Sequence, residues 1–182
     1  MSENNFDVLI IGGGPSGAAC AIKLADQGLN VALLDKAVFP RDKTCGDALS
    51  TDVINQLPML SPKLAESFMS LAEKIPSYGV KIFSPDQNFI DIPFIYNQKK
   101  SHGYICKRIH FDNFLFQFVK EHTNIKTFED HSVQKVMDKG NEIEVITDKG
   151  SFTADRVPIH RSLPRSGHAP PRGARCPPVH RR

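Results

Sequence analysis

Three glycines near the N-terminus have the types and spacing of a phosphate-binding loop. The segment FDVLIIGGGPSGAACAIKLADQGLNVALLD carries the pattern G-x-G-x-x-G at Gly12, Gly14 and Gly17. We expect Gly12 to make a tight turn, Gly14 to let the backbone approach a pyrophosphate, and Gly17 to let a helix pack closely on a strand. The spacing therefore predicts a dinucleotide-binding loop.

The residues between these glycines complete the predicted loop. Pro15 suits the first position of a helix, because the N–H that it lacks has no partner there. The free N–H groups and the positive dipole end of such a helix favour phosphate. Gly13, Pro15 and Ser16 are therefore candidate cofactor-binding residues together with Gly12, Gly14 and Gly17.

An acidic residue follows at the distance that a dinucleotide site requires. Asp35 stands 21 residues after Gly14, at the end of a second apolar run, where a carboxylate accepts hydrogen bonds from a ribose diol. A carboxylate there favours NAD or FAD over NADP, whose extra phosphate it would repel. The alternative is a β-α-β unit with a glycine turn and no ligand.

Secondary-structure patterns place these residues in an α/β fold. A strand at residues 6–11, a helix and a strand ending at Asp35 form a β-α-β unit. Helices are predicted at 51–57 with Ser50 as N-cap and Pro58 and Pro62 bracketing its end, at 63–74, and at 110–122. Strands are predicted at 125–128, 132–137, 142–147 and 151–155, and a hairpin at about 78–95.

The helix at 110–122 carries an apolar stripe at helical spacing. The stripe consists of Phe111, Phe114, Leu115, Phe118 and Val119. Core packing explains it better than a ring-stacking site does.

Composition restricts the classes of protein that the chain can be. Its 182 residues suffice for one domain with a substantial core, and 40% are hydrophobic. No segment has the roughly 20 apolar residues that cross a bilayer, and the N-terminus has no signal-peptide pattern, so we expect a cytoplasmic protein. The four cysteines form no C-x-x-C pair, and no metal site or disulfide framework is expected.

The C-terminal residues differ in character from the rest. Residues 157–182 hold six arginines and six prolines but no lysine and no acid, whereas residues 1–156 hold 14 lysines, 3 arginines and 20 acids. We expect residues 157–182 to be disordered. A basic tail for nucleic acid or membrane is one interpretation, and a change of reading frame is the one that we favour. No specific nucleic-acid partner is predicted.

Three segments together resemble the geranylgeranyl reductase family of FAD-dependent oxidoreductases, which have a fold of the para-hydroxybenzoate hydroxylase type. The first is the glycine loop, the second is PRDKTCGDALS, similar to the family's P-x-x-K-x-C-G-x-x-L-[ST] loop, and the third is KRIHFDNFLFQFV, similar to its R-x-x-F-D-x-x-L element. The second segment is the most discriminating. The resemblance implies a Rossmann-like FAD-binding domain with a β-meander and a hairpin insertion.

The resemblance also implies roles for particular residues. FAD would lie with its pyrophosphate on the glycine loop and its ribose on Asp35, with Lys36 beside it. Cys45 and Gly46 would lie toward the flavin, and Arg108 would face the cofactor. No catalytic acid or base is identified. The alternatives are an inert loop thiol for Cys45 and a surface charge for Arg108.

The implied activity is reduction of C=C bonds in a prenyl substrate, with NAD(P)H as the external electron donor. The substrate would be a small molecule or a lipid, and the protein could associate peripherally with a membrane. The family pattern continues with a G-A-D-G motif and a later G-D motif that residues after Arg156 do not show. We therefore expect residues 1–156 to form an incomplete, C-terminally truncated FAD-binding domain. The rivals are a monooxygenase or halogenase of the same fold, a non-catalytic nucleotide-binding fragment, and a nucleic-acid binder. No oligomeric state is predicted.

Overall fold

The computed structural model describes residues 4–158, so the tail predicted at 157–182 lies almost entirely outside the described residues. The chain divides into two compact units, residues 1–39 with 115–182, and residues 40–114. Along the described residues no helix combines the length and the apolar character needed to span a membrane.

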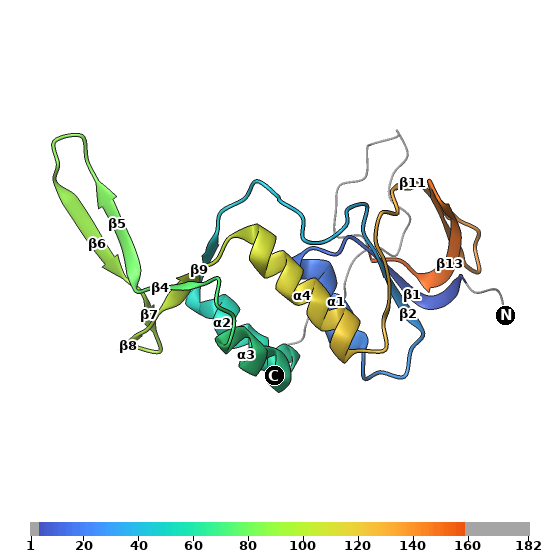
Figure 1. The fold of residues 1–182 in the computed structure, drawn as a ribbon, viewed down its shortest axis with the longest axis horizontal. Helices are drawn as coiled ribbons and strands as arrows, with labels where there is room; N and C mark the ends of the chain where they lie inside the picture. The colour runs from blue at the N-terminus through green and yellow to red at the C-terminus, as the bar shows by residue number, and fades with distance from the viewer. Residues whose placement is uncertain (1–3, 159–182) are drawn as a thin grey trace. The chain divides into compact units, whose positions relative to one another are not determined.

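The first unit is built on a six-stranded mixed sheet with the order β10-β2-β1-β13-β12-β11 (Figure 1). Its strands are β1 (Asn5–Ile11), β2 (Val31–Leu34), β10 (Lys126–Phe128), β11 (Val133–Asp138), β12 (Ile143–Thr147) and β13 (Gly150–Arg156). Strands β10, β2, β1 and β13 run parallel, and β11, β12 and β13 form an antiparallel meander. The α/β fold class and the meander predicted from the sequence are confirmed.

Helix α1 (Pro15–Leu24) connects β1 to β2 and buries small residues. All four residues of β2 are buried, as expected for a central strand that is covered on both faces. One face of the sheet carries the core formed by Phe6, Leu9 and Leu34 with Phe152 of the meander. The β-α-β unit thus holds the end of β1, the start of α1 and the end of β2 at one edge of a packed sheet.

The second unit contains short elements around an aromatic core. Its helices are α2 (Thr51–Leu60), α3 (Pro62–Met69) and the first residues of α4 (Arg108–His122). Its strands are β3 (Ala48–Leu49), β4 (Ile75–Ser77), β5 (Gly79–Phe83), β6 (Phe89–Pro93), β7 (Ile95–Tyr96), β8 (Lys99–Lys100) and β9 (Gly103–Ile105). Phe68 of α3 is fully buried and meets Tyr104, Phe111 and Phe114 edge to face.

Strands β5 and β6 form a hairpin at the predicted place, and Figure 1 shows it extending from β4 and β9 of the same unit. The sheet β3-β9-β4 and the small hairpin β7-β8 were not predicted. Strands of two or three residues are too short to show the alternation on which sequence analysis depends.

All three helices predicted after residue 50 differ from the structure at their ends, α4 only in that it begins two residues earlier, at Arg108. Helix α2 starts after its N-cap Ser50 as expected but continues through Pro58 to Leu60. Pro58 lies in the last turn, where the helix loses a single hydrogen bond. Helix α3 ends at Met69 and not at residue 74, and the Lys74 ammonium donates to the carbonyls of Met69 and Leu71 at this end.

Helix α4 buries more than the predicted stripe. Phe111, Leu115, Phe118 and Val119 are buried as expected, but Phe116, outside the stripe, is completely buried as well. Its ring stacks on Phe39, with 4.1 Å between centroids and 4° between planes. Sequence periodicity predicts one buried face of a helix. Phe116 lies on another face and is buried because Phe39, in the loop after β2, packs on it.

Candidate functional site

The glycine loop follows β1 and is held against the end of β2. Gly12 adopts a φ of 105°, which favours glycine, and its N–H donates to the Leu34 carbonyl over 2.7 Å. A Cβ on Gly17 would lie 1.8 Å from the Gly12 carbonyl oxygen. The close approach of α1 to the loop therefore excludes every side chain at Gly17.

The N-terminus of α1 offers backbone N–H groups as hydrogen-bond donors. Gly14 is the N-cap residue and makes no side-chain capping bond, and Pro15 occupies the first turn. The N–H groups of this first turn, at residues such as Ser16, belong to the end of the helix where no intrahelical carbonyl is available. An anion placed here would accept hydrogen bonds from these N–H groups and would be stabilised by the positive end of the helix dipole.

Asp35 directly follows β2 and holds the loop in place. Its carboxylate accepts the Gly13 N–H over 2.7 Å and the Ala37 N–H over 2.9 Å, and the side chain is almost fully buried. Its backbone N–H donates to Phe128 of β10. Each oxygen of a carboxylate has about two lone-pair directions, so a carboxylate that accepts backbone N–H groups is also a chemical type that accepts from a ribose hydroxyl. Lys36, the next residue, is exposed.

Gly13 has a packing role that the sequence did not predict. A Cβ on Gly13 would lie 2.9 Å from the ring of Phe116 and 3.3 Å from that of Phe39. The stacked pair of rings thus presses against the loop and limits its freedom. The signal for this contact was absent from the sequence, because Phe39 lies in a loop and Phe116 lies off the predicted stripe.

The other predicted site residues, Cys45, Gly46 and Arg108, belong to the second unit. Cys45 is exposed, and Gly46 has no atoms within 4 Å of a Cβ built on it. Arg108 begins α4, and its backbone N–H donates to the Asp47 carboxylate over 3.1 Å. Asp47 thereby holds the start of the helix to the loop that carries Cys45.

A buried carboxylate organises two arginines in this unit. Asp112 is completely buried and accepts two hydrogen bonds from Arg108, at 2.7 Å from Nε and 2.8 Å from Nη2. Arg41 pairs with the same carboxylate over 3.3 Å. Two guanidinium groups thus converge on one carboxylate, and the planar fork of donors of a guanidinium group is suited to binding an anion.

The environment of Arg108 stabilises its charge. The hydrogen bonds to Asp112 raise the pKa of Arg108 above its usual value, the Cys45 side chain adds to this rise, and burial works against it. The guanidinium therefore remains charged, and the thiol of Cys45 lies beside a permanent cation. The roles of Cys45 and Arg108 toward a cofactor stay predictions.

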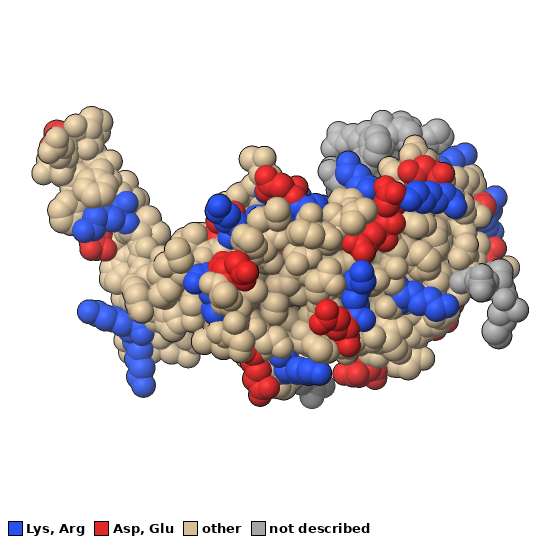
Figure 2. Space-filling model, in the orientation of Figure 1, with Lys and Arg blue, Asp and Glu red and all other residues tan. Residues whose placement is uncertain are grey.

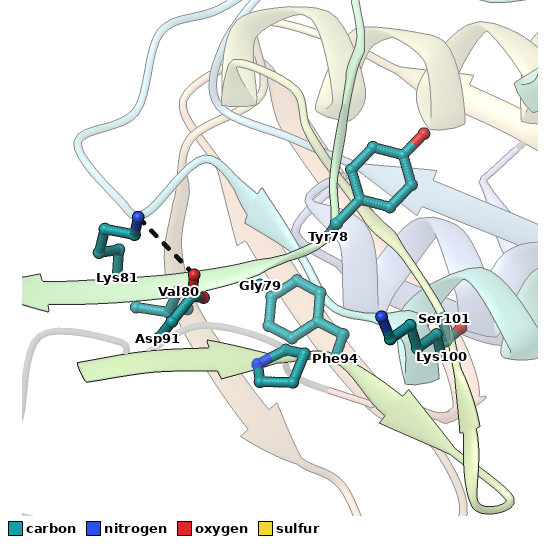
Figure 3. Close-up of a pocket in the computed structure, with 9 residues that line it drawn as sticks. Tyr78, Gly79, Val80, Lys81, Asp91, Phe94, Lys100 and Ser101 are labelled. Carbon is teal, nitrogen blue, oxygen red and sulfur yellow. Dashed lines mark ion pairs between the residues drawn. The ribbon is translucent and has the colours of Figure 1, made fainter.

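A cavity of about 330 Å³ lies at the base of the β5-β6 hairpin, apart from these residues. Tyr78, Val80 and Phe94 contribute to its largely apolar lining (Figure 3). Lys81 and Asp91 form an ion pair of 3.7 Å at its edge. None of the residues predicted from the sequence to bind a cofactor lines this cavity.

Comparison with known proteins supports the predicted family. Residues 7–48, from β1 to β3, match the model of the FAD-dependent oxidoreductase (DAO) family. The digeranylgeranylglycerophospholipid reductase of Sulfolobus acidocaldarius is 41% identical over 92 residues, which are 50% of this chain and 19% of that protein. The geranylgeranyl diphosphate reductase of Rhodobacter capsulatus is 34% identical over 88 residues, 48% of this chain and 20% of that protein.

Solved structures show the same fold. The halogenase PltM in complex with FAD superposes with a TM-score of 0.73 at 21% identity, over 87% of this chain and 34% of that one. A flavoprotein from Cytophaga hutchinsonii gives 0.74 at 18% identity, over 85% and 38%. The chain therefore spans about a fifth of these curated relatives and just over a third of these structures. The predicted resemblance to FAD-dependent oxidoreductases, geranylgeranyl reductases among them, is confirmed.

Proposed function

We propose that this chain binds FAD through the loop Gly12–Gly17 and Asp35. The contact between Gly17 and Gly12, which leaves no room for a side chain, carries the proposal together with the uncapped start of α1. These features bring backbone donors to a position where a pyrophosphate fits. Asp35 would hold the adenosine ribose, with Lys36 beside it.

The arginine cluster and its neighbouring thiol are proposed as further cofactor contacts. Arg108, held by Asp112, would direct its fixed donors at an anionic group of FAD. Cys45 and Gly46 would lie toward the flavin, as the resemblance implies. Bound FAD would supply hydride transfer, and the part of these residues is to bind it, orient it and keep the positive charge in place.

The activity that we propose is reduction of a C=C bond in a prenyl substrate, as in a geranylgeranyl reductase, with NAD(P)H as the external donor and the cytoplasm as the location. The two reductases above, which are 41% and 34% identical to this chain over the matched residues, support this choice. A chlorinase of Pseudomonas fluorescens, 28% identical over 113 residues, supports the alternative of a flavin-dependent halogenase.

Titration of the purified chain with FAD tests the cofactor. We expect saturable quenching of flavin fluorescence near one equivalent, and a gain of about 2.7 kcal/mol in the free energy of unfolding at a hundredfold excess over Kd. FMN, which lacks the adenosine and the pyrophosphate, is the matched control and should bind far more weakly. Equal responses to FAD and FMN, or none, would contradict the proposal.

Product analysis tests the activity. With FAD reduced in the absence of air, hydrogenation of a geranylgeranyl lipid is the expected result, detected by mass spectrometry. Chlorination of a phenol with chloride and air would favour the halogenase. FAD binding with neither product would identify the chain as a non-catalytic nucleotide-binding fragment.

A further inference from the structure

One face of the β5-β6 hairpin consists of aliphatic side chains in contact with water. The strand register pairs Val80 with Ile92 and Ile82 with Ile90. Paired residues and residues two apart share a face of a sheet, so these four side chains form a single surface. They are between 46% and 65% exposed. We call these four residues the aliphatic face.

The charges of this hairpin belong to its other face and its turn. Lys81 and Asp91 pair with each other on the opposite face, and the Lys81 ammonium also lies 4.4 Å from the centre of the Phe89 ring. Asp86 lies in the turn, where it accepts from Ser84 and Asn88. The aliphatic face itself carries no charge, and a two-stranded hairpin with such a face gains stability from contact with an apolar medium.

The neighbouring β7-β8 hairpin adds apolar and basic groups. Ile95 and Tyr96 are exposed and pair with Lys100 and Lys99 across the hairpin. Among the described residues no carboxylate lies within ion-pair distance of either lysine. Figure 2 shows blue side chains projecting at this hairpin, whose position Figure 1 gives. Residues 94–107 contain three lysines and no acid.

The apolar cavity joins the two hairpins. Val80 of the aliphatic face and Lys100 of β8 both line it, with Phe94 between their strands (Figure 3). The Phe94 N–H donates to Tyr78 and its carbonyl accepts from Ser101, so the two hairpins are linked through the backbone. Aliphatic surface and uncompensated positive charge therefore occur together in one part of the second unit.

These features select among the possible occupants. A second copy of the chain would bring lysines against lysines, and four half-exposed side chains fall short of the roughly 800 Å² that each partner of a stable complex buries. Nucleic acid would satisfy the lysines but leave the aliphatic face in water. An anionic lipid surface provides hydrocarbon for the aliphatic face and Tyr96, and negative charge for Lys99 and Lys100.

We propose that the β5-β6 and β7-β8 hairpins dock this protein on anionic lipid membranes, with the aliphatic face inserted at the interface and Lys99 and Lys100 at the headgroups. This surface contains none of the residues proposed to bind FAD. Docking and cofactor binding can therefore be measured separately.

Co-sedimentation with vesicles tests the proposal. We expect binding to mixed phosphatidylglycerol and phosphatidylcholine vesicles, weaker binding at high salt, and far weaker binding to phosphatidylcholine alone. K99Q/K100Q should lower the affinity roughly fivefold for each lysine, and I82S/I90S should lower it on both kinds of vesicle. Lys63→Gln, at an exposed position of α3, removes one charge elsewhere and should have little effect.

Several outcomes would overturn the proposal. They are absence of binding, equal binding to both kinds of vesicle, and a loss with Lys63→Gln equal to that with K99Q/K100Q. A dimer in sedimentation velocity that I82S/I90S abolishes, without vesicle binding, would assign the surface to a second copy. FAD titration and circular dichroism of the same variants separate a docking defect from a failure of the nucleotide site or of folding.

Discussion

At the scale of single residues, Gly17 has the least freedom to vary. Gly17→Ala would place a methyl group 1.8 Å from the Gly12 carbonyl oxygen, a backbone atom of the loop. We expect a loss of about 2–3 kcal/mol in the free energy of unfolding and the loss of FAD binding, measured by urea denaturation and fluorescence titration.

Gly46→Ala is the matched control, because no atom lies within 4 Å of the added methyl group. Its free energy of unfolding should change by less than about 0.5 kcal/mol. Equal destabilisation by the two substitutions would show that the close packing of loop and helix is not what requires a glycine at residue 17.

Asp112 is the carboxylate on which Arg108 and Arg41 depend. Asp112→Asn removes the only charge that the described residues place against both guanidinium groups within ion-pair distance. Because the carboxylate is completely buried, we expect a loss of about 3 kcal/mol in the free energy of unfolding.

The exposed pair of Lys139 and Glu144, 3.2 Å apart, provides the comparison. Lys139→Gln should cost less than about 1 kcal/mol, since water and salt screen an exposed pair. Urea denaturation of both variants measures the difference, and similar losses would show that Asp112 does not act as a buried ion pair.

The cysteines should differ in reactivity. Burial raises the pKa of the Cys106 thiol, and the nearby Glu73 and Asp47 raise it further, so the thiol remains neutral near pH 7. Cys45 is exposed. In the folded protein an alkylating reagent should label Cys45 well before Cys106, as peptide mass spectrometry will show. Preferential labelling of Cys106 would contradict the described packing around it.

At the scale of elements, α4 shows where periodicity stops being informative. Phe116 is completely buried between Phe39 and Gly13, although the stripe predicted from the sequence omits it, and Phe114, which the stripe includes, is only half-buried. We expect Phe116→Ala to cost about 3–5 kcal/mol in the free energy of unfolding and Phe114→Ala to cost less. Denaturant midpoints at constant m-value measure both losses. A larger loss for Phe114→Ala than for Phe116→Ala would show that the stripe predicted from the sequence describes the packing of the helix better than the structure does.

The elements that the sequence predicted well are those with local signals. The β-α-β unit has apolar runs and glycines, and the meander has alternation with turns at residues 138–141 and 148–150. The sheet β3-β9-β4 joins residues about 30 to 60 positions apart through strands of two or three residues, which carry no local pattern. Its existence depends on the contacts around Phe68.

At the scale of the whole molecule, exposed apolar surface is concentrated on the β5-β6 hairpin. I82S/I90S should raise the solubility limit while changing the free energy of unfolding by less than about 1 kcal/mol, because both side chains are already exposed. Leu64→Ser is the control, since Leu64 is completely buried and its replacement should unfold the protein. Turbidity and urea denaturation measure the two effects, and a large loss of stability in I82S/I90S would show that the hairpin supports the core.

The sequence by itself determined the β-α-β unit, the glycine loop, Asp35 and the resemblance to FAD-dependent oxidoreductases, because these depend on spacing along a continuous chain. The tertiary structure alone decided that Asp35 holds Gly13, that Phe39 and Phe116 press on the loop, and that Asp112 joins Arg41 to Arg108. Each of these contacts joins residues from different elements or turns, and such contacts depend on how the elements pack. The exposure of the aliphatic face was likewise decided by the tertiary structure, because the sequence does not show which side chains the fold leaves uncovered.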